Sequence, residues 1–285
     1  MGRDIFKTGF RGLDERRFGG IKRGEFVAIY TSAGMETAFL SQMLVNMLSY
    51  VPSVKCLYFT LGGSKEVFYN KLACIKNGVE YERYGECKNR TEKDVKKINQ
   101  ARQWLKEKLC EGNAKSLVID NVYTIAEIVL CVAEAKTSFG VDVVFIDELR
   151  RLRDYANEDI RYALSILKEL STRLNISVIV DDYFRYDGNL SRIEQIQDKH
   201  VFREADKVIL SIRPGLYTAK QMENDDVEKE WVDFYILKNQ TGDIGCFSLK
   251  FDFRTFRFYD PRDKDLDEQE PAFEDGDEYF IEKED

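Results

Sequence analysis

The 285-residue chain has one histidine, four prolines and no two cysteines in a C-x-x-C arrangement. The single histidine, His200, argues against catalysis that depends on imidazole, and the six scattered cysteines argue against a zinc site or a disulfide framework. No apolar run reaches the ~18 residues that a membrane span requires, and the first residues lack the apolar stretch of a signal peptide. We therefore expect a cytoplasmic protein with free thiols and no membrane partner.

Charge is distributed unevenly along the chain. The net charge is −8, but residues 260–285 alone hold 13 acidic and 3 basic side chains, so the preceding residues carry a net charge of +2. Acidic segments of this kind are usually solvated, and they repel DNA phosphates or compete with them for a basic surface. The change in charge predicts one domain over residues 1–259 and an acidic, flexible tail over 260–285.

Hydrophobic residues make up 44% of the chain, and their spacing indicates two kinds of segment. Continuous apolar, β-branched runs predict strands at 25–31, 54–61, 116–121, 142–148, 176–182, 207–213, 231–238, 247–252 and 255–260. Apolar residues at three- and four-residue spacing predict helices at 37–50, 64–77, 91–110, 124–138 and 157–174. This order predicts an α/β fold with a mostly parallel sheet between helices and antiparallel strands at its carboxyl end.

Three segments lie in the order expected of a nucleotide-binding P-loop domain. The stretch "YTSAGMETAF" at 30–39 lies between a strand and a helix, where a P-loop would read G-x-x-x-x-G-K-[ST]. The run "VDVVFIDEL" is an apolar strand that ends at Asp147, in the manner of strands whose carboxylate holds magnesium. The phrase "KNQTGDIG" follows a late strand. Taken singly, an aspartate at a strand end is more often a turn or cap residue.

The residues before this loop, "KTGFRGLDERRFGGIKRGEFVAIY", resemble the start of the ATPase domain of DnaB-type replicative helicases, which belong to helicase superfamily 4. The family phrase TGF..LD...GG...GE is matched by Thr8, Gly9, Phe10, Leu13, Asp14, Gly19, Gly20, Gly24 and Glu25. The resemblance continues in order to about residue 260. It implies a RecA-like P-loop NTPase fold, a role in DNA replication and a nucleotide site.

The resemblance assigns that site to a set of residues in several parts of the chain: Ser32, Ala33, Gly34, Met35, Glu36, Thr37, Asp147 and Lys238. Thr37 and Asp147 would be the magnesium ligands. Met35, however, stands where a glycine lets the backbone wrap the phosphates, and Glu36 replaces the lysine that neutralises them. At ~4 Å a unit charge contributes about 1–4 kcal/mol, so this reversal of charge costs roughly 2–8 kcal/mol of binding free energy.

Three further positions depart from the family pattern. Gly62 stands where the family has its catalytic glutamate, and Gln240 replaces an arginine that reaches the neighbouring subunit's nucleotide. In "VIVDDYF", Tyr183 or at best an aspartate aligns with a phosphate-sensing glutamine. Losses at so many separate positions predict a helicase-like protein with a vestigial ATP site, no ATPase activity and no required cofactor. Such a protein would act through binding, and the expected partner is a replicative helicase, another replisome protein or further copies in a ring.

One alternative is a divergent, active ATP-dependent DNA helicase. It would use ATP and magnesium, with Thr37, Asp147 and Lys238 at the nucleotide and Glu148 as the catalytic base, because other P-loop ATPases place a glutamate directly after the strand-end aspartate. Contact with DNA has weak support in the sequence. The stretch 185–204 mixes acids with bases, and the basic cluster "LRRLRD" at 149–154 is more often a solvated surface than a phosphate site.

Overall fold

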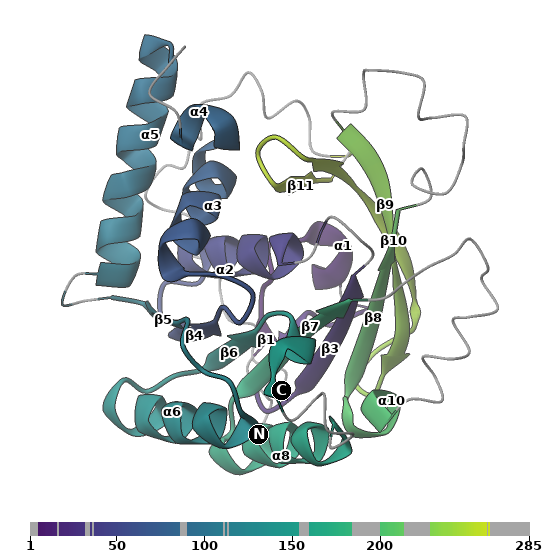
Figure 1. Cartoon of the computed structure of the whole chain (residues 1–285). Coiled ribbons are helices and arrows are strands. Elements are labelled where there is room, and N and C mark those ends of the chain that lie inside the picture. The colour runs from purple at the N-terminus through teal and green to yellow at the C-terminus, as the bar shows by residue number, and fades with distance from the viewer. Residues whose placement is uncertain are drawn as a thin grey trace.

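The computed structural model describes residues 5–15, 17–31, 35, 37–85, 90–110, 112, 114–153, 160–183, 200–213, 229–260 and 262. Within these ranges a nine-stranded sheet runs through the molecule, with helices on both faces (Figure 1). Its strand order is β11-β10-β9-β8-β3-β7-β6-β4-β5. The predicted α/β fold with a mostly parallel sheet is confirmed.

The central strands run parallel because helical connections return the chain between them. They are β3 (Phe26–Thr31), β4 (Cys56–Phe59), β5 (Ser116–Ile119), β6 (Val143–Ile146), β7 (Ser177–Tyr183) and β8 (Lys207–Ile212). Alternate side chains enter two hydrophobic cores, so that Val27 and Ile29 of β3 face one core and Phe26 and Ala28 face the other. Burial on both faces explains why these strands read as continuous apolar runs.

Antiparallel strands extend the sheet beyond β8. They are β9 (Lys229–Asn239), β10 (Gly245–Asp252) and β11 (Arg257–Tyr259). In the pairing of β8 with β9, Val208 lies opposite Lys238. A separate two-stranded antiparallel sheet consists of β1 (Ile5–Phe6) and β2 (Ile21–Lys22).

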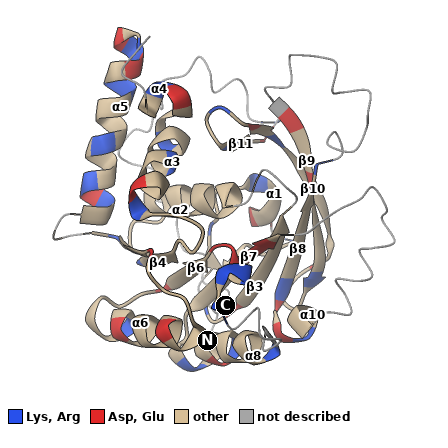
Figure 2. Cartoon of the chain, in the orientation of Figure 1, with Lys and Arg blue, Asp and Glu red and all other residues tan. Residues whose placement is uncertain are grey.

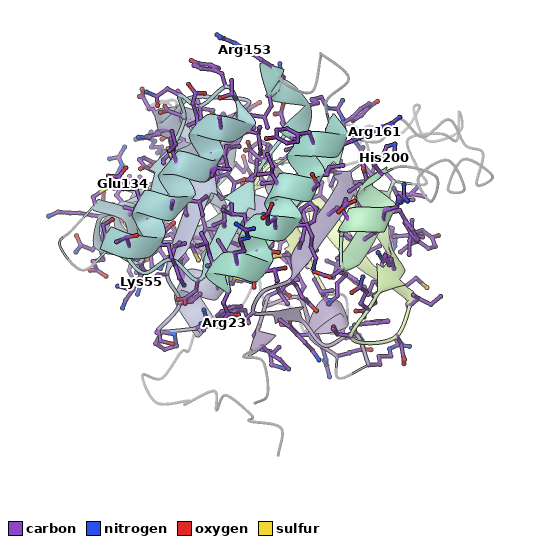
Figure 3. The ribbon with its side chains drawn as sticks, turned by 90° about the horizontal axis from the view of Figure 1, so that it is seen from below. Arg23, Lys55, Glu134, Arg153, Arg161 and His200 are labelled. Carbon is purple, nitrogen blue, oxygen red and sulfur yellow. The ribbon has the colours of Figure 1, made fainter. Side chains whose placement is uncertain are left out.

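The helices form two layers. One face of the sheet carries α2 (Ala38–Tyr50), α3 (Lys65–Asn77), α4 (Tyr81–Gly85) and α5 (Glu92–Leu105) (Figure 1). The other face carries α6 (Ile125–Ser138), α8 (Ile160–Leu174) and α10 (His200–Glu204). Figure 3 shows α6 and α8 side by side, with Glu134 on α6 and Arg161 on α8. No described helix is long and apolar enough to cross a membrane.

The structure departs from the predicted elements in a few places. The predicted helix 91–110 is α-helical only to the end of α5 and continues as the π-helix η1 (Lys106–Cys110). Four short described helices had no signal in the sequence pattern: α1 (Arg11–Asp14), α4, the 3-10 helix η2 (Leu149–Arg151) and α10. The start of the predicted helix at 157–159 and most of the predicted tail, residues 261 and 263–285, lie outside the described residues.

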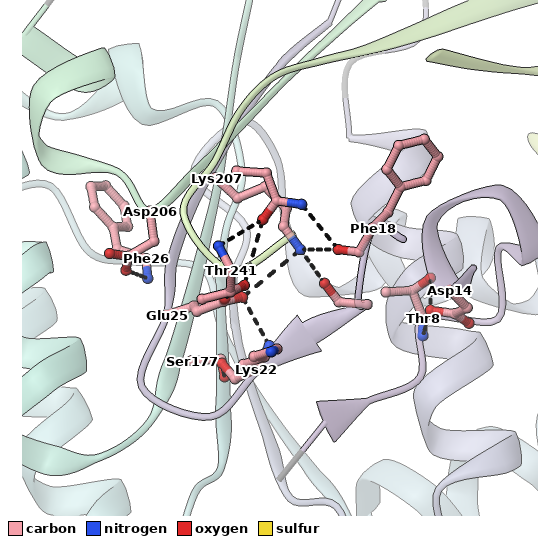
Figure 4. A network of polar contacts seen from close by, with 12 residues as sticks. Thr8, Asp14, Phe18, Lys22, Glu25, Phe26, Ser177, Asp206, Lys207 and Thr241 are labelled. Carbon is pink, nitrogen blue, oxygen red and sulfur yellow. Dashed lines mark hydrogen bonds and ion pairs between the residues drawn. The ribbon is translucent and has the colours of Figure 1, made fainter. Parts of the chain in front are cut away.

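A buried lysine connects the amino-terminal phrase to the sheet (Figure 4). Lys207 is 0% exposed, and its Nζ donates to the backbone oxygens of Phe18 (3.0 Å) and Gly20. The same nitrogen lies 4.0 Å from the carboxylate of Glu25, which accepts a hydrogen bond from Thr241 Oγ1 (2.7 Å). The turn that contains Gly19 and Gly20 is therefore held against β8, and Glu25 connects β8 to Thr241 in the turn between β9 and β10.

Candidate functional site

The carboxyl ends of β3, β4, β6 and β7 lie at the same edge of the sheet, which is where open α/β sheets bind ligands. In the register of β6 with β7, Ile146 pairs with Val180, so the next residues, Asp147 and Asp181, lie side by side on neighbouring strands. The loop between β3 and α2 begins at the same edge, after Thr31. The topology thus brings the predicted Thr37 and Asp147 together.

Part of the predicted P-loop can be placed. Four of its residues lie outside the described residues: Ser32, Ala33, Gly34 and Glu36. Met35 is 0% exposed and belongs to the core on the α2 face of the sheet, so the side chain expected to crowd the loop packs into that core instead. Thr37 precedes α2 with a left-handed backbone (φ 68°) and makes no side-chain cap.

Asp181 lies next to the start of α2. Its carboxylate accepts hydrogen bonds from Thr31 Oγ1 (2.7 Å) and from the backbone N–H of Thr37 (3.2 Å). The residue is 1% exposed, and this burial raises the pKa of its carboxyl group well above the ordinary value. Free N–H groups at a helix start are the usual partners of a bound phosphate. Here one of them is taken by a carboxylate of the protein itself.

Asp147 is equally enclosed. Its Oδ1 accepts from the backbone N–H of Leu61 (2.7 Å) and its Oδ2 from the hydroxyl of Tyr58 (3.3 Å). Burial raises the pKa of this carboxyl group to about 7, and the neighbouring charge of Glu148 acts in the same direction. Both oxygens of this carboxyl group are thus already engaged by groups of the chain itself. Among the described residues, no group of three acidic, cysteine or histidine side chains could hold a metal ion.

Glu148 fills the space beside Gly62. A Cβ atom placed on Gly62 would lie 2.1 Å from Glu148 Oε1, closer than any real contact. Glu148 itself has a left-handed backbone (φ 47°), and its carboxylate pairs with Arg151 Nε at 2.6 Å. The space beside Gly62 thus holds a carboxylate that follows the end of β6.

The basic cluster at 149–154 is engaged within the chain, as far as the structure describes it. Arg150 pairs with Asp182 (2.8 Å) and lies over the ring of Tyr183 (4.4 Å), and Arg153 lies over the ring of Tyr123 (5.0 Å). Asp154 and the stretch 184–199, which contains most of the segment considered for DNA contact, lie outside the described residues. Arg150 and Arg151, each paired with a carboxylate, are therefore poor candidates for a phosphate site.

Lys238 is not brought to this site. Because β9 runs antiparallel to β8, the pairing of Lys238 with Val208 places it near the amino end of β8, at the opposite edge of the sheet from Asp147. Its Nζ donates to the backbone oxygens of Phe202 (2.7 Å) and Arg203 (3.2 Å) at the end of α10. Gln240, in the turn after β9, is exposed, and its backbone N–H donates to Asp206 O (3.0 Å).

One residue at this edge, Asp181, was not singled out from the sequence. The run "VIVDDY" contained the signal, since an acidic residue directly after a fully apolar strand stands at the ligand edge of the sheet. The sequence alone could not show that β7 lies directly between β3 and β6, because that order joins segments far apart in the chain, such as Thr31 and Asp181.

Comparison with known proteins connects this geometry to a family. The family model described as "DnaB-like helicase C terminal domain" matches residues 6–260. Among solved structures, one described as an ATPase domain superposes with a TM-score of 0.73 at 21% identity, covering 90% of this chain and 92% of that one. A DnaB-like replicative helicase, solved in a study of its interactions with primase, gives 0.73 at 20% identity, covering 91% of this chain and 62% of that one.

A KaiC-like protein from the hyperthermophilic archaeon Pyrococcus horikoshii OT3 gives a TM-score of 0.59 at 16% identity, covering 91% of this chain and 99% of that one. A search of curated proteins found no significant match. At these identities the structural likeness establishes the fold, which is that of RecA-like ATPase domains.

Proposed function

The chain belongs to the DnaB-like helicase C-terminal domain family, and from that premise we propose that it is a member that acts by binding other proteins and does not hydrolyse ATP. The observation that carries this proposal is the hydrogen bond from the Thr37 N–H to the buried Asp181 carboxylate (3.2 Å). At the start of α2, where a phosphate-binding helix presents free N–H groups to its ligand, this chain places a carboxyl group of its own.

The charges at the site support the same conclusion. The acidic side chains described at this edge of the sheet, Asp147, Glu148 and Asp181, supply no positive charge for a phosphate, and Arg151 pairs with Glu148 (2.6 Å). The sequence adds Glu36 where the resembled family has a lysine. An ATP molecule carries several negative charges, each of which loses about 1–4 kcal/mol per like charge at ~4 Å. Repulsion of this size exceeds the free energy that separates micromolar from millimolar binding, about 4 kcal/mol.

The family supplies the class of partner. The second structural relative is a replicative helicase studied with primase, so we propose that this chain binds a replicative helicase, another replisome protein or further copies of itself in a ring. The test is capture of the purified helicase of the same cell by the full chain, combined with light scattering of the chain alone. If the chain does not capture the helicase, that partner is excluded. A monomeric mass in light scattering excludes a ring of copies of this chain.

Calorimetry with ATP and magnesium tests the nucleotide site. The wild-type chain should show no binding at about 1 mM ATP, a concentration that corresponds to about −4 kcal/mol of binding free energy. The double variant Glu36→Lys, Asp181→Asn should gain measurable affinity, because it restores a cation and replaces a carboxyl group that can ionise next to a bound phosphate by a neutral amide. The control Glu134→Lys makes the same charge change on α6, on the far face of the sheet, and should gain none (Figure 3). Micromolar binding by the wild type would overturn the proposal.

A second candidate function has one observation in its favour. The carboxylate of Glu148 lies beside Gly62, the position that the resemblance assigns to a catalytic glutamate, so Glu148 could act as the base of a divergent ATP-dependent helicase that also uses Thr37 and Asp147. DNA-stimulated ATP hydrolysis that disappears in both Glu148→Gln and Asp147→Ala would establish this function.

A further inference from the structure

Three basic side chains, from the end of α3, from η1 and from the start of β11, lie close enough for their charges to interact. They are Lys76, Lys108 and Arg257, each partly buried, and we refer to them as the Lys76 cluster. Figure 2 shows blue bands on α3 and α5 and near the start of β11. Lys76 Nζ lies 5.5 Å from the ring of Trp104 and donates to Ser49 Oγ (3.2 Å), so aromatic and hydroxyl groups surround its charge.

Arg257 extends the cluster over the end of α3. Its guanidinium lies 5.0 Å from the ring of Tyr259, and its Nη1 lies 2.6 Å from the position that a Cβ on Gly78 would take. Gly78 caps α3 with a left-handed backbone (φ 60°). The absence of a side chain at this residue is what allows the arginine to approach the helix end.

The charge of the cluster is not neutralised by the surrounding protein. In the part of the chain that the structure describes, none of the three residues forms an ion pair with a carboxylate. Burial lowers the pKa of Lys76, and the like charges of Arg257 and Lys108 lower it further. The carboxyl end of α3 contributes only about half a negative charge, which offsets a small part of three positive ones. A surface of this kind favours an anion.

The acidic tail is the anion nearest in the chain. Residues 260–285 carry a net charge of −10, and they begin three residues after Arg257. The start of the tail is held by Arg262, which pairs with Glu15 (3.2 Å). A chain spans about 3.3 Å per extended residue, so residues 263–285 are long enough to reach the cluster from there. A short tether also raises the effective concentration of the tail to about millimolar. Its aromatic residues, Phe273, Tyr279 and Phe280, suit the rings of Trp104 and Tyr259.

We propose that the acidic tail docks on the Lys76 cluster of its own chain and shields this surface from other polyanions. The proposal is independent of the nucleotide site, because it involves the opposite end of α3 and holds whether or not ATP is hydrolysed.

Proteolysis of the full-length chain after acidic residues tests the docking. In the wild type, the tail should be cut more slowly in dilute salt (about 50 mM) than in concentrated salt (about 500 mM), since salt screens exposed ion pairs. Each such pair contributes roughly a factor of two, so three of them give about tenfold protection. The triple variant Lys76→Gln, Lys108→Gln, Arg257→Gln should lose this protection. Circular dichroism confirms that the variant is folded, and the salt series on the wild type stands by itself if it is not.

A matched triple variant controls for net charge. Lys93→Gln, Arg161→Gln, Arg203→Gln removes three exposed cations elsewhere and should keep the wild-type protection. Equal cutting rates of the tail in the wild type and the Lys76-cluster variant at low salt would overturn the proposal. So would binding of a single-stranded oligonucleotide that is lost in the cluster variant while the cutting rate is unchanged, because the surface would then belong to nucleic acid.

Discussion

At the carboxyl edge of the sheet, two aspartates hold their carboxyl groups out of water. Asp147 and Asp181 are each 1% exposed, and burial raises the pKa of both. A raised pKa means that the folded chain binds a proton that the unfolded chain has released at the same pH. Folding is therefore favoured at low pH, and this contribution is lost as the pH rises through the folded-state pKa.

The variant Asp147→Asn tests this linkage. The pKa of Asp147 is about 7 in the folded chain and 3.8 as the ordinary value. Ionisation of Asp147 should therefore lower the free energy of unfolding by up to about 4 kcal/mol as the pH rises from about 4 to about 8. Asparagine keeps the shape without the titration, so the variant should lose much of the wild-type decline with pH. Urea unfolding of both proteins at about pH 4 and about pH 8, without divalent cations, measures this decline in the free energy of unfolding. An identical decline in the variant would contradict the assignment.

Met35 provides a second test at this scale. Because its side chain is 0% exposed in the core on the α2 face, Met35→Ala should lower the free energy of unfolding by about 2–5 kcal/mol. Denaturant titration measures the loss, with an exposed residue of α6, Leu130→Ala, as the control that should change little. A loss below about 1 kcal/mol would mean that Met35 is not part of the core. Replacing it with glycine to rebuild a P-loop would destabilise the fold.

At the scale of elements, the amino-terminal phrase that ends at Glu25 links parts of the chain that are far apart in sequence. Glu25 and Lys207 are both fully enclosed, and their contacts join the turn at 18–20, the start of β8 and the turn after β9 (Figure 4). Removing one partner of a buried pair leaves the other charge without compensation, which costs more than the pair contributes. The phrase that most resembles the helicase family is thus explained here by structural support.

A double-mutant cycle tests the interaction between Lys207 and Glu25. Lys207→Met alone should lower the unfolding free energy by about 3–5 kcal/mol, because the carboxylate of Glu25 then stays buried without its cation. The double variant Lys207→Met, Glu25→Gln should recover part of this loss. Urea unfolding of the four proteins gives the coupling energy. Additive losses would show that the two residues do not compensate each other.

At this same scale the sequence predicted the long elements well. Every strand from β3 to β11 overlaps a predicted segment, because burial on both faces leaves an unbroken apolar run such as that of β6. Helices of four or five residues, such as α1 and α10, are too short to show a period. The sequence predicted Thr37 and Asp147 as residues of the site but did not identify Asp181, since only the strand order brings β7 between β3 and β6.

Over the whole molecule, charge separates the two predicted parts of the chain. The described domain is close to neutral in sequence and has a core on each face of its sheet, whereas residues 260–285 are strongly acidic. We expect that such a core does not need the tail for its stability, because few of residues 260–285 are apolar. Arg262 at the start of the tail pairs with Glu15 of the domain (3.2 Å), and electrostatic attraction to the Lys76 cluster would add a second connection that salt weakens.

Deletion of residues 263–285 tests that separation. In about 500 mM salt the unfolding free energy of the shortened chain should equal that of the full chain to within about 0.5 kcal/mol. Denaturant titrations of both chains make the comparison. A large loss at high salt would show that the tail is part of the folded domain, and the boundary at residue 259 would then be wrong.

The contact between Glu148 and Gly62 also bears on how this domain can evolve. Any side chain at position 62 would begin 2.1 Å from Glu148 Oε1, so a glutamate could return there only after Glu148 had moved or changed. Glu148 in turn is held by its ion pair with Arg151 (2.6 Å). A side chain at position 62 therefore requires the Glu148 carboxylate to swing aside, and the ion pair with Arg151 sets the free-energy cost of that movement. Positions 62, 148 and 151 are thus coupled, so the residues that one of them tolerates depend on the residues at the other two.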